Sequence, residues 1–139
     1  MFKDKRESLV ASLKREGRIK AAEVEKAFLE IPREKFVPDI IKNHSYIDTP
    51  LEIGNGQTIS APHMVAIMCE ALDIKKEQSI LEIGAGSGYH AAIVSKIIGD
   101  KGHIYTVERF PSLAERAQNN LENVGIRNVT VETLSLIHI

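Results

Sequence analysis

Residues 79–89 read SILEIGAGSGY, and this stretch decides the fold. Its first half is apolar and has the length of a short strand, which we expect to be buried. Glycines then occupy every second position, at Gly84, Gly86 and Gly88. Glycine has no Cβ and tolerates positive φ, so it suits a tight turn whose backbone lies close to a ligand. The stretch therefore predicts a strand, a glycine turn and the start of a helix.

A second strand and an acidic residue follow that helix, which begins near Tyr89. The free N–H groups and the positive dipole end of the helix face the glycine turn. Residues 103–107, HIYTV, form the next apolar strand and lead directly into Glu108. This acid follows Gly88 by about 20 positions, where nucleotide-binding α/β folds place a carboxylate that accepts hydrogen bonds from ribose hydroxyls. We therefore predict a βαβ unit that binds a ribose-containing molecule.

The glycine spacing and Glu82 indicate which molecule this is. A dinucleotide fingerprint is G-x-G-x-x-G, whereas this loop is G-x-G-x-G and follows an acid. A carboxylate repels a pyrophosphate, but it suits the sulfonium and ammonium of S-adenosylmethionine, which has no phosphate. The residues favour S-adenosylmethionine over a dinucleotide. A glycine turn that binds nothing is the remaining alternative.

Helices and one more strand surround this unit. Apolar periodicity predicts helices over residues 3–16, 21–31, 62–72 and 111–124 and a strand over 128–132. The order strand, helix, strand, helix, strand implies right-handed crossovers and a parallel sheet. The predicted fold class is therefore α/β, with about half of the strands of a doubly wound sheet.

Small polar side chains precede the helix that begins at Pro62. Ser60 is placed as its N-cap, and Thr58 offers a second hydroxyl beside the same helix N-terminus. Such a site suits a carboxylate, although a purely capping role for Ser60 fits the spacing equally well. The sequence identifies no partner for Asp48, and no His–Asp pair is evident near Ser60.

The composition argues against several classes of partner. Lys and Arg number 18 against 19 Asp and Glu, giving a net charge of -1, and there is no Trp. We therefore expect no nucleic-acid or membrane partner. The single cysteine, Cys69, is expected to be a buried small hydrophobe, which fits a reducing cytoplasm. The first residues lack the apolar core of a signal peptide, and the histidines are too scattered for a metal site.

Residues 134–139 read LSLIHI and show no helix or turn pattern. They are also the translation of ctgtctcttatacacatc, a sequencing-library adapter. We therefore expect the natural sequence to stop near Thr133 and the tail to be non-native. Other codons at these positions in the DNA would contradict this expectation.

Three further patterns, together with the glycine loop, carry a family resemblance. They read PREKFVP at 32–38, PLEIG at 50–54, GQTISAPHMV at 56–65 and LEIGAGSGY at 81–89. The glycine loop is shared by many methyltransferases, whereas the Gln-Thr-Ile-Ser segment is far more specific. Over residues 1–132 the sequence resembles the protein-L-isoaspartate O-methyltransferase family.

This resemblance implies a Rossmann-like, S-adenosylmethionine-dependent methyltransferase fold, with a helical extension over 1–50 and a cofactor-binding half over 51–133. It implies methyl transfer to the α-carboxylate of L-isoaspartyl residues in damaged proteins, a repair reaction. Isoaspartyl peptides and proteins would be the partners, in the cytoplasm, with a monomer expected for the complete protein. Carried over by position, Ser60 matches the catalytic serine, and the matched cofactor-binding positions are Thr58, Ile59, His63, Glu82, Gly84, Gly86, Gly88 and Glu108.

The expected acceptor is a carboxylate, which is already ionised at neutral pH and needs no general base. Ser60 is then a positioning donor rather than a nucleophile. The family continues its third strand with an Asp-Gly turn, where this sequence has Glu132-Thr133 and the tail. We therefore expect the chain as given to be inactive and to expose an apolar sheet edge. The alternatives are a related methyltransferase acting on a small molecule or RNA, and a non-catalytic cofactor-binding fragment.

Overall fold

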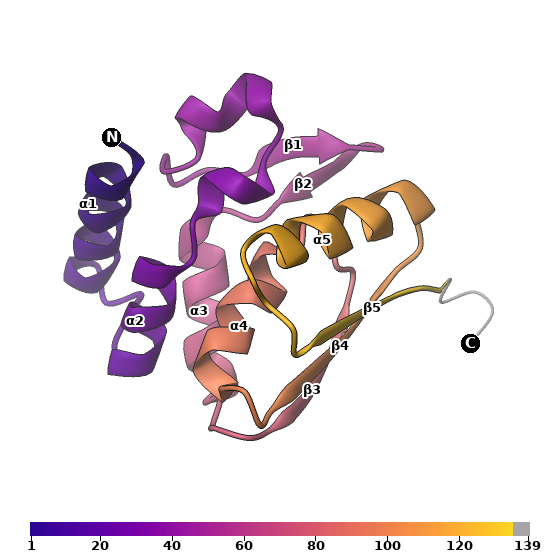
Figure 1. The fold of residues 1–139 in the computed structure, drawn as a ribbon. Helices are drawn as coiled ribbons and strands as arrows, with labels where there is room; N and C mark the ends of the chain where they lie inside the picture. Colours follow the sequence, from indigo (N-terminus) through magenta and orange to yellow (C-terminus); the bar gives the residue numbers. More distant parts are fainter. Residues whose placement is uncertain (135–139) are drawn as a thin grey trace.

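The computed structural model describes residues 1–134 (Figure 1). The predicted non-native tail lies outside the described residues from position 135 onward. None of the helices in residues 1–134 is long and apolar enough to cross a bilayer. The elements are α1 Phe2–Arg15, α2 Ala22–Glu30, 3-10 turns Arg33–Phe36 and Asp39–His44, β1 Leu51–Gly54, β2 Gln57–Ile59, α3 Pro62–Leu72, β3 Ser79–Ile83, α4 Tyr89–Ile98, β4 His103–Glu108, α5 Pro111–Asn123 and β5 Val129–Thr133.

The strands β3, β4 and β5 form a parallel sheet in that order. Ile80 of β3 lies opposite Ile104 of β4, and Ile104 lies opposite Val129 of β5. α4 and α5 connect these strands, and both helices pack on the sheet. The βαβαβ prediction is therefore confirmed, and it brings the carboxyl ends of β3 and β4 together beside the glycine loop.

The first two helices, α1 and α2, form one end of the molecule (Figure 1). Their predicted apolar faces are confirmed, since Leu13 of α1 and Phe28 of α2 are almost fully buried. α2 packs against α4, where the ring of Phe28 meets the ring of Tyr89 edge-on at 6.4 Å. The helical extension is therefore continuous with the core that supports the glycine loop.

A β-hairpin lies where the sequence predicted only a flexible turn. β1 and β2 pair antiparallel, and Asn55 turns between them at φ 55°. The hairpin is fastened to α5, because Arg116 Nη1 donates to the Ile53 carbonyl at 2.8 Å and Asn55 Nδ2 donates to Ser112 Oγ at 3.1 Å. Long-range contacts of this kind leave no periodic signal in a short strand.

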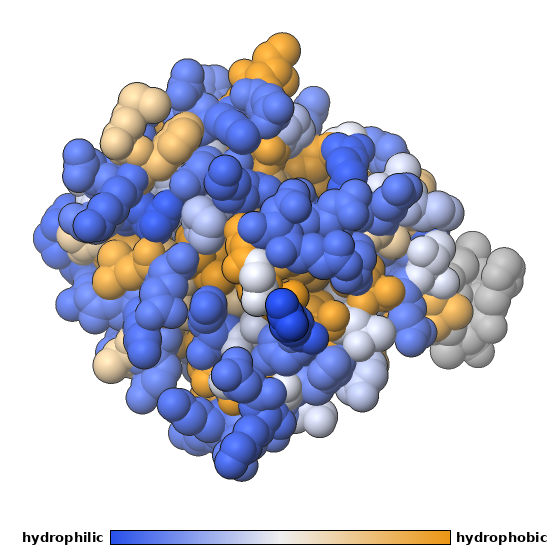
Figure 2. Space-filling view, in the orientation of Figure 1, coloured by the Kyte–Doolittle hydropathy of each residue, from blue (hydrophilic) through white to orange (hydrophobic). Residues whose placement is uncertain are grey.

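One face of the sheet is apolar and exposed, so the prediction of a buried first strand is wrong in part. Leu81, Ile83 and Tyr105 are 65%, 54% and 50% exposed, whereas the alternating residue Ile104 faces the helices and is buried. β3 is also an edge strand of this sheet. The face seen in Figure 2, by contrast, is mainly hydrophilic, with apolar atoms gathered near its centre. An apolar face on an edge strand is a surface for association.

We expect the 139-residue chain on its own to self-associate through this face. The double variant Leu81→Thr, Ile83→Thr places β-branched threonines on β3 and removes apolar surface, so it should shift the chain toward monomer. Sedimentation velocity measures the distribution of species. The control is Ile40→Thr, which removes a side chain that is 93% exposed outside the sheet and should change nothing. A monodisperse wild-type monomer would contradict this expectation.

Candidate functional site

The glycine loop crosses the carboxyl ends of β3 and β4. Gly84, Gly86 and Gly88 adopt φ values of +89°, +53° and +89°, the left-handed region that favours glycine. The Gly84 N–H donates to the Val107 carbonyl at 2.8 Å, which ties the loop to β4. A Cβ on Gly88 would lie 3.3 Å from the Ala117 carbonyl of α5, whereas a Cβ on Gly84 would meet open space. The loop backbone is therefore packed at its end and accessible at its start.

Glu108 holds this loop from the end of β4. Its Oε1 accepts from the Gly86 N–H at 2.9 Å and its Oε2 accepts from the Phe110 N–H at 3.1 Å. The residue is only 6% exposed. A carboxylate can accept about four hydrogen bonds, so acceptor positions remain for a ligand. The sequence predicted the ligand contact, and the structure adds an ordering role for the loop.

Glu82 is a buried acid directly before the loop. Thr106 of β4 donates its hydroxyl to Glu82 Oε1 at 2.6 Å, and His90 Nδ1 lies 3.7 Å from Oε2. Burial raises the pKa of Glu82 to about 7; the Thr106 hydrogen bond opposes this shift, and the nearby charge of Glu108 adds to it within that value. Burial also lowers the pKa of His90, so its imidazole is neutral at pH 7. Glu82 is therefore an acid with a raised pKa, and none of these neighbours is a permanent cation.

Cys69 extends this group but supplies no nucleophile. Its Sγ lies 3.6 Å from His90 Nε2, and the residue is buried as predicted. Burial raises the pKa of the Cys69 thiol to about 12, so the thiol stays protonated near neutrality.

The segment before α3 presents its polar side chains to solvent. Ile59 is buried and anchors β2, while Thr58 and Ser60 are exposed. The Ser60 hydroxyl makes no hydrogen bond to another residue within 1–134, and the Ser60 carbonyl accepts from Arg33 Nη2 at 3.1 Å. The N-cap prediction for Ser60 is wrong, because the N-cap is Ala61 and has no side-chain hydrogen bond.

Asp48 takes over part of the capping role that was predicted for Ser60. Its Oδ1 accepts from the His63 N–H at 2.8 Å and lies 2.9 Å from His63 Nδ1. The structure therefore contains a His–Asp pair near Ser60 that was not evident in the sequence. The two residues are 15 positions apart, and the antiparallel β1–β2 hairpin between them brings them together, so no local pattern reveals the pair.

The predicted site residues thus form two groups. One lies at the sheet edge and comprises Glu82, Gly84, Gly86, Gly88 and Glu108. The other lies at the start of α3 and comprises Thr58, Ile59, Ser60 and His63. The hairpin lies against the first group, since a Cβ on Gly86 would lie 3.5 Å from Ile53 Cδ1 of β1, and β2 of the same hairpin carries Thr58 and Ile59 of the second group.

Comparison with known proteins places residues 4–134 in one family. The family model described as Protein-L-isoaspartate(D-aspartate) O-methyltransferase (PCMT) matches residues 4–134. A protein-L-isoaspartate O-methyltransferase from Ignicoccus hospitalis is 51% identical over 130 residues, which is 94% of this chain and 62% of that protein.

Solved structures agree with this assignment and show the Rossmann-like methyltransferase fold. A protein-L-isoaspartate O-methyltransferase superimposes with a TM-score of 0.82 at 37% identity, covering 92% of this chain and 41% of that one. A Plasmodium falciparum protein of the same description, solved in complex with S-adenosyl-L-homocysteine, superimposes with a TM-score of 0.81 at 28% identity. The match covers 93% of this chain and 62% of that one. The chain spans 62% and 59% of the length of the first two curated relatives. It belongs to the protein-L-isoaspartate(D-aspartate) O-methyltransferase family.

Proposed function

We propose that this chain supplies the donor site and the acceptor-positioning serine of a repair enzyme. The enzyme would transfer a methyl group from S-adenosylmethionine to the α-carboxylate of L-isoaspartyl residues in damaged proteins. The observation that carries the proposal is the exposed, unpartnered Ser60 hydroxyl among residues 1–134. This hydroxyl lies in the family-specific segment, and the Ser60 carbonyl is joined through Arg33 to the helix that follows the glycine loop.

The residues at the sheet edge fit the methyl donor. Glu82 would face its positive charge, which the ionised carboxylate attracts. Glu108 would accept from the ribose hydroxyls through the lone pairs that the loop leaves free. Gly84 leaves open space beside its backbone, where the ligand can approach closely. When bound, the cofactor supplies an electrophilic methyl group.

The residues before α3 fit the acceptor. An α-carboxylate has a pKa near 3 to 4, so it arrives ionised and the chain needs no base to activate it. The Ser60 hydroxyl would donate to that carboxylate and orient one oxygen toward the donor. Thr58 and the His63–Asp48 pair flank this position. Orientation alone can lower a barrier by ~7–11 kcal/mol, which is the main contribution the chain would make.

The proposed function also has consequences for partners and location. We propose isoaspartyl peptides and proteins as substrates, no nucleic acid, a cytoplasmic location and a monomer for the complete enzyme. The near-neutral net charge of -1 and the protonated, buried Cys69 thiol support these points. Residues 1–50 would serve as the helical extension and residues 51–133 as the cofactor-binding half.

A hybrid protein tests this function. It joins residues 1–133 of this chain to the remaining part of the Ignicoccus hospitalis relative, because the relatives are longer than this chain. We expect it to methylate an isoaspartyl peptide and to leave the matched aspartyl peptide and an RNA acceptor unmodified. Methylation of RNA, or of neither peptide by a hybrid that binds S-adenosylhomocysteine, would reject the proposed substrate.

Replacing Ser60 by alanine in this hybrid should lower kcat by about 10- to 150-fold. The variant loses a hydrogen bond to a charged group, worth about 1.5–3 kcal/mol. The affinity for S-adenosylhomocysteine, measured by calorimetry, should stay the same. Ser79→Ala is the matched control, because Ser79 is exposed at the amino end of β3, away from the site. Unchanged turnover in Ser60→Ala would remove Ser60 from the mechanism.

A further inference from the structure

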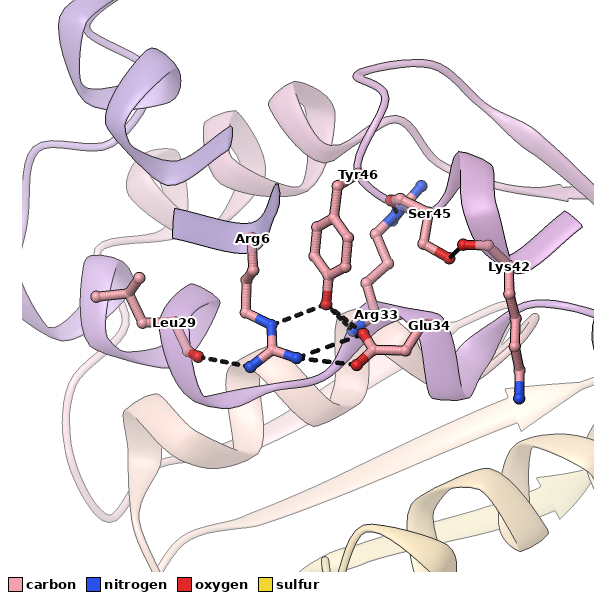
Figure 3. Close-up of polar contacts among 7 residues, drawn as sticks. All are labelled: Arg6, Leu29, Arg33, Glu34, Lys42, Ser45 and Tyr46. Carbon is pink, nitrogen blue, oxygen red and sulfur yellow. Dashed lines mark hydrogen bonds and ion pairs between the residues drawn. The ribbon is translucent and has the colours of Figure 1, made fainter. Parts of the chain in front are cut away.

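Arg33 is a fully buried cation in the PREKFVP segment, and the function proposed above names it only as a link and gives its side chain no part in methyl transfer. The residue is 0% exposed. Its Nε donates to the Ser45 carbonyl at 2.7 Å, and its Nη2 donates to the Ser60 carbonyl at 3.1 Å. Figure 3 shows the guanidinium beside Ser45, with the side chain passing Tyr46. Arg33 therefore fixes the backbone of the residue whose hydroxyl would hold the acceptor.

The same guanidinium packs against the end of the glycine loop. Its Cζ lies 4.9 Å from the centroid of the Tyr89 ring. Tyr89 is the first residue of α4, directly after Gly88, and is 2% exposed. The rings of Phe28 and Phe36 meet Tyr89 edge-on, which keeps it in place. One side chain thus contacts both the acceptor segment and the helix that carries the donor loop.

This arrangement is costly if its only purpose is packing. Burial lowers the pKa of Arg33, and within residues 1–134 the Nη1 atom is buried without a hydrogen-bond partner. Apolar side chains of similar volume often replace buried ions without loss of stability. A planar guanidinium, however, can hold two carbonyls in a fixed geometry, which an apolar side chain cannot do.

We propose that Arg33 is a positioning residue for methyl transfer, which sets the Ser60 backbone relative to the first turn of α4. This inference rests on the proposed function. A hydroxyl can align the acceptor only if its own backbone is fixed, and a misplacement of about 1 Å can cost roughly 100-fold in rate. Arg33 acts through Ser60 and Tyr89 and touches no reacting atom.

The test uses Arg33→Met and Arg33→Lys in the hybrid protein. Methionine keeps the apolar stem, and lysine keeps the charge but lacks the planar fork. We expect kcat on the isoaspartyl peptide to fall by about 30- to 100-fold in both variants. The dissociation constant for S-adenosylhomocysteine should stay within about twofold, because the donor contacts of Glu82 and Glu108 are untouched. Thermal unfolding is recorded for each variant, and rates are measured well below each midpoint.

Arg6→Met is the matched control for a loss of stability. Arg6 belongs to the same network, since it donates to Tyr46 Oη at 2.8 Å, to Glu34 at 2.9 Å and to the Leu29 carbonyl at 3.2 Å (Figure 3). It makes no hydrogen bond to Ser60 and no ring contact with Tyr89 within residues 1–134. This variant should melt at a lower temperature with unchanged kcat.

The outcomes separate the two proposals. If the wild-type hybrid methylates no isoaspartyl peptide, the proposed function fails before Arg33 is tested. If the wild type is active and the Arg33 variants keep its kcat, the positioning role is rejected. The role is also rejected if Arg6→Met loses as much kcat as they do, or if both Arg33 variants fail to fold while Arg6→Met folds. A selective loss of kcat in the Arg33 variants supports it.

Discussion

Glu108→Ala is expected to weaken the binding of S-adenosylhomocysteine to the hybrid protein by about 10- to 150-fold. Hydrogen bonds to a carboxylate contribute about 1.5–3 kcal/mol, and the ribose would lose them. The Gly86 and Phe110 N–H groups would lose their acceptors as well, so the loop would become less ordered. Calorimetric titration gives the dissociation constant, and thermal unfolding gives the stability.

Glu115→Ala provides the control, because Glu115 is exposed on α5 and should affect neither quantity. A Glu108→Ala protein that melts earlier but binds with unchanged affinity would show that Glu108 only orders the loop. That result would remove the ribose contact from the account.

Binding of the methyl donor is expected to strengthen about tenfold between pH 6 and pH 8 through Glu82. Its pKa of about 7 means that the carboxyl is mostly protonated at pH 6 and mostly ionised at pH 8. A cationic ligand favours the ionised form, so binding at low pH must release a proton. The groups that face this carboxyl are Thr106 and Glu108 on β4 and His90 on α4, with Cys69 on α3 behind His90.

Stability should change with pH in the opposite direction. The pKa of Glu82 in the folded state is raised above its usual value of 4.5, so the folded chain holds the proton more tightly. Glu82 therefore contributes on the order of 3 kcal/mol to the free energy of unfolding below about pH 4.5, and this contribution is lost as the pH rises through 7. Unfolding titrations of the ligand-free hybrid at several pH values measure this change in the free energy of unfolding.

Glu82→Gln is the control for both effects, since it removes the titration while keeping the size of the side chain. The pH dependence of donor affinity should flatten between pH 6 and 8, and that of stability between about pH 4.5 and 7. If Glu82→Gln keeps the full tenfold change, another group is responsible and Glu82 does not face the cation.

The sequence predicted the elements whose signals are local. The glycine pattern, the strand ending in Glu108 and the helical periodicity around Phe28 gave the correct βαβαβ order. Capping was predicted less well, because the Ser60 assignment relied on residue type and position just before Pro62 alone. The nearest acceptor for the first amides of α3 is Asp48, from a segment 15 residues away from His63.

The remaining errors have the same physical cause. The contacts of Arg33 with Ser60 and Tyr89 depend on segments 27 and more residues apart, which no spacing rule relates. The exposure of Leu81 depends on which elements cover the sheet, and an apolar run looks the same whether or not it is covered. The sequence thus predicted the features that local backbone patterns determine. It did not predict the features that depend on tertiary packing.

Titration of the hybrid protein with S-adenosylhomocysteine, beside a parallel titration with NAD, tests the central claim most directly. We predict saturable one-to-one binding of S-adenosylhomocysteine and no measurable binding of NAD, because an acid precedes a glycine loop that lacks dinucleotide spacing. A folded hybrid that binds NAD, or that binds neither ligand, would contradict it.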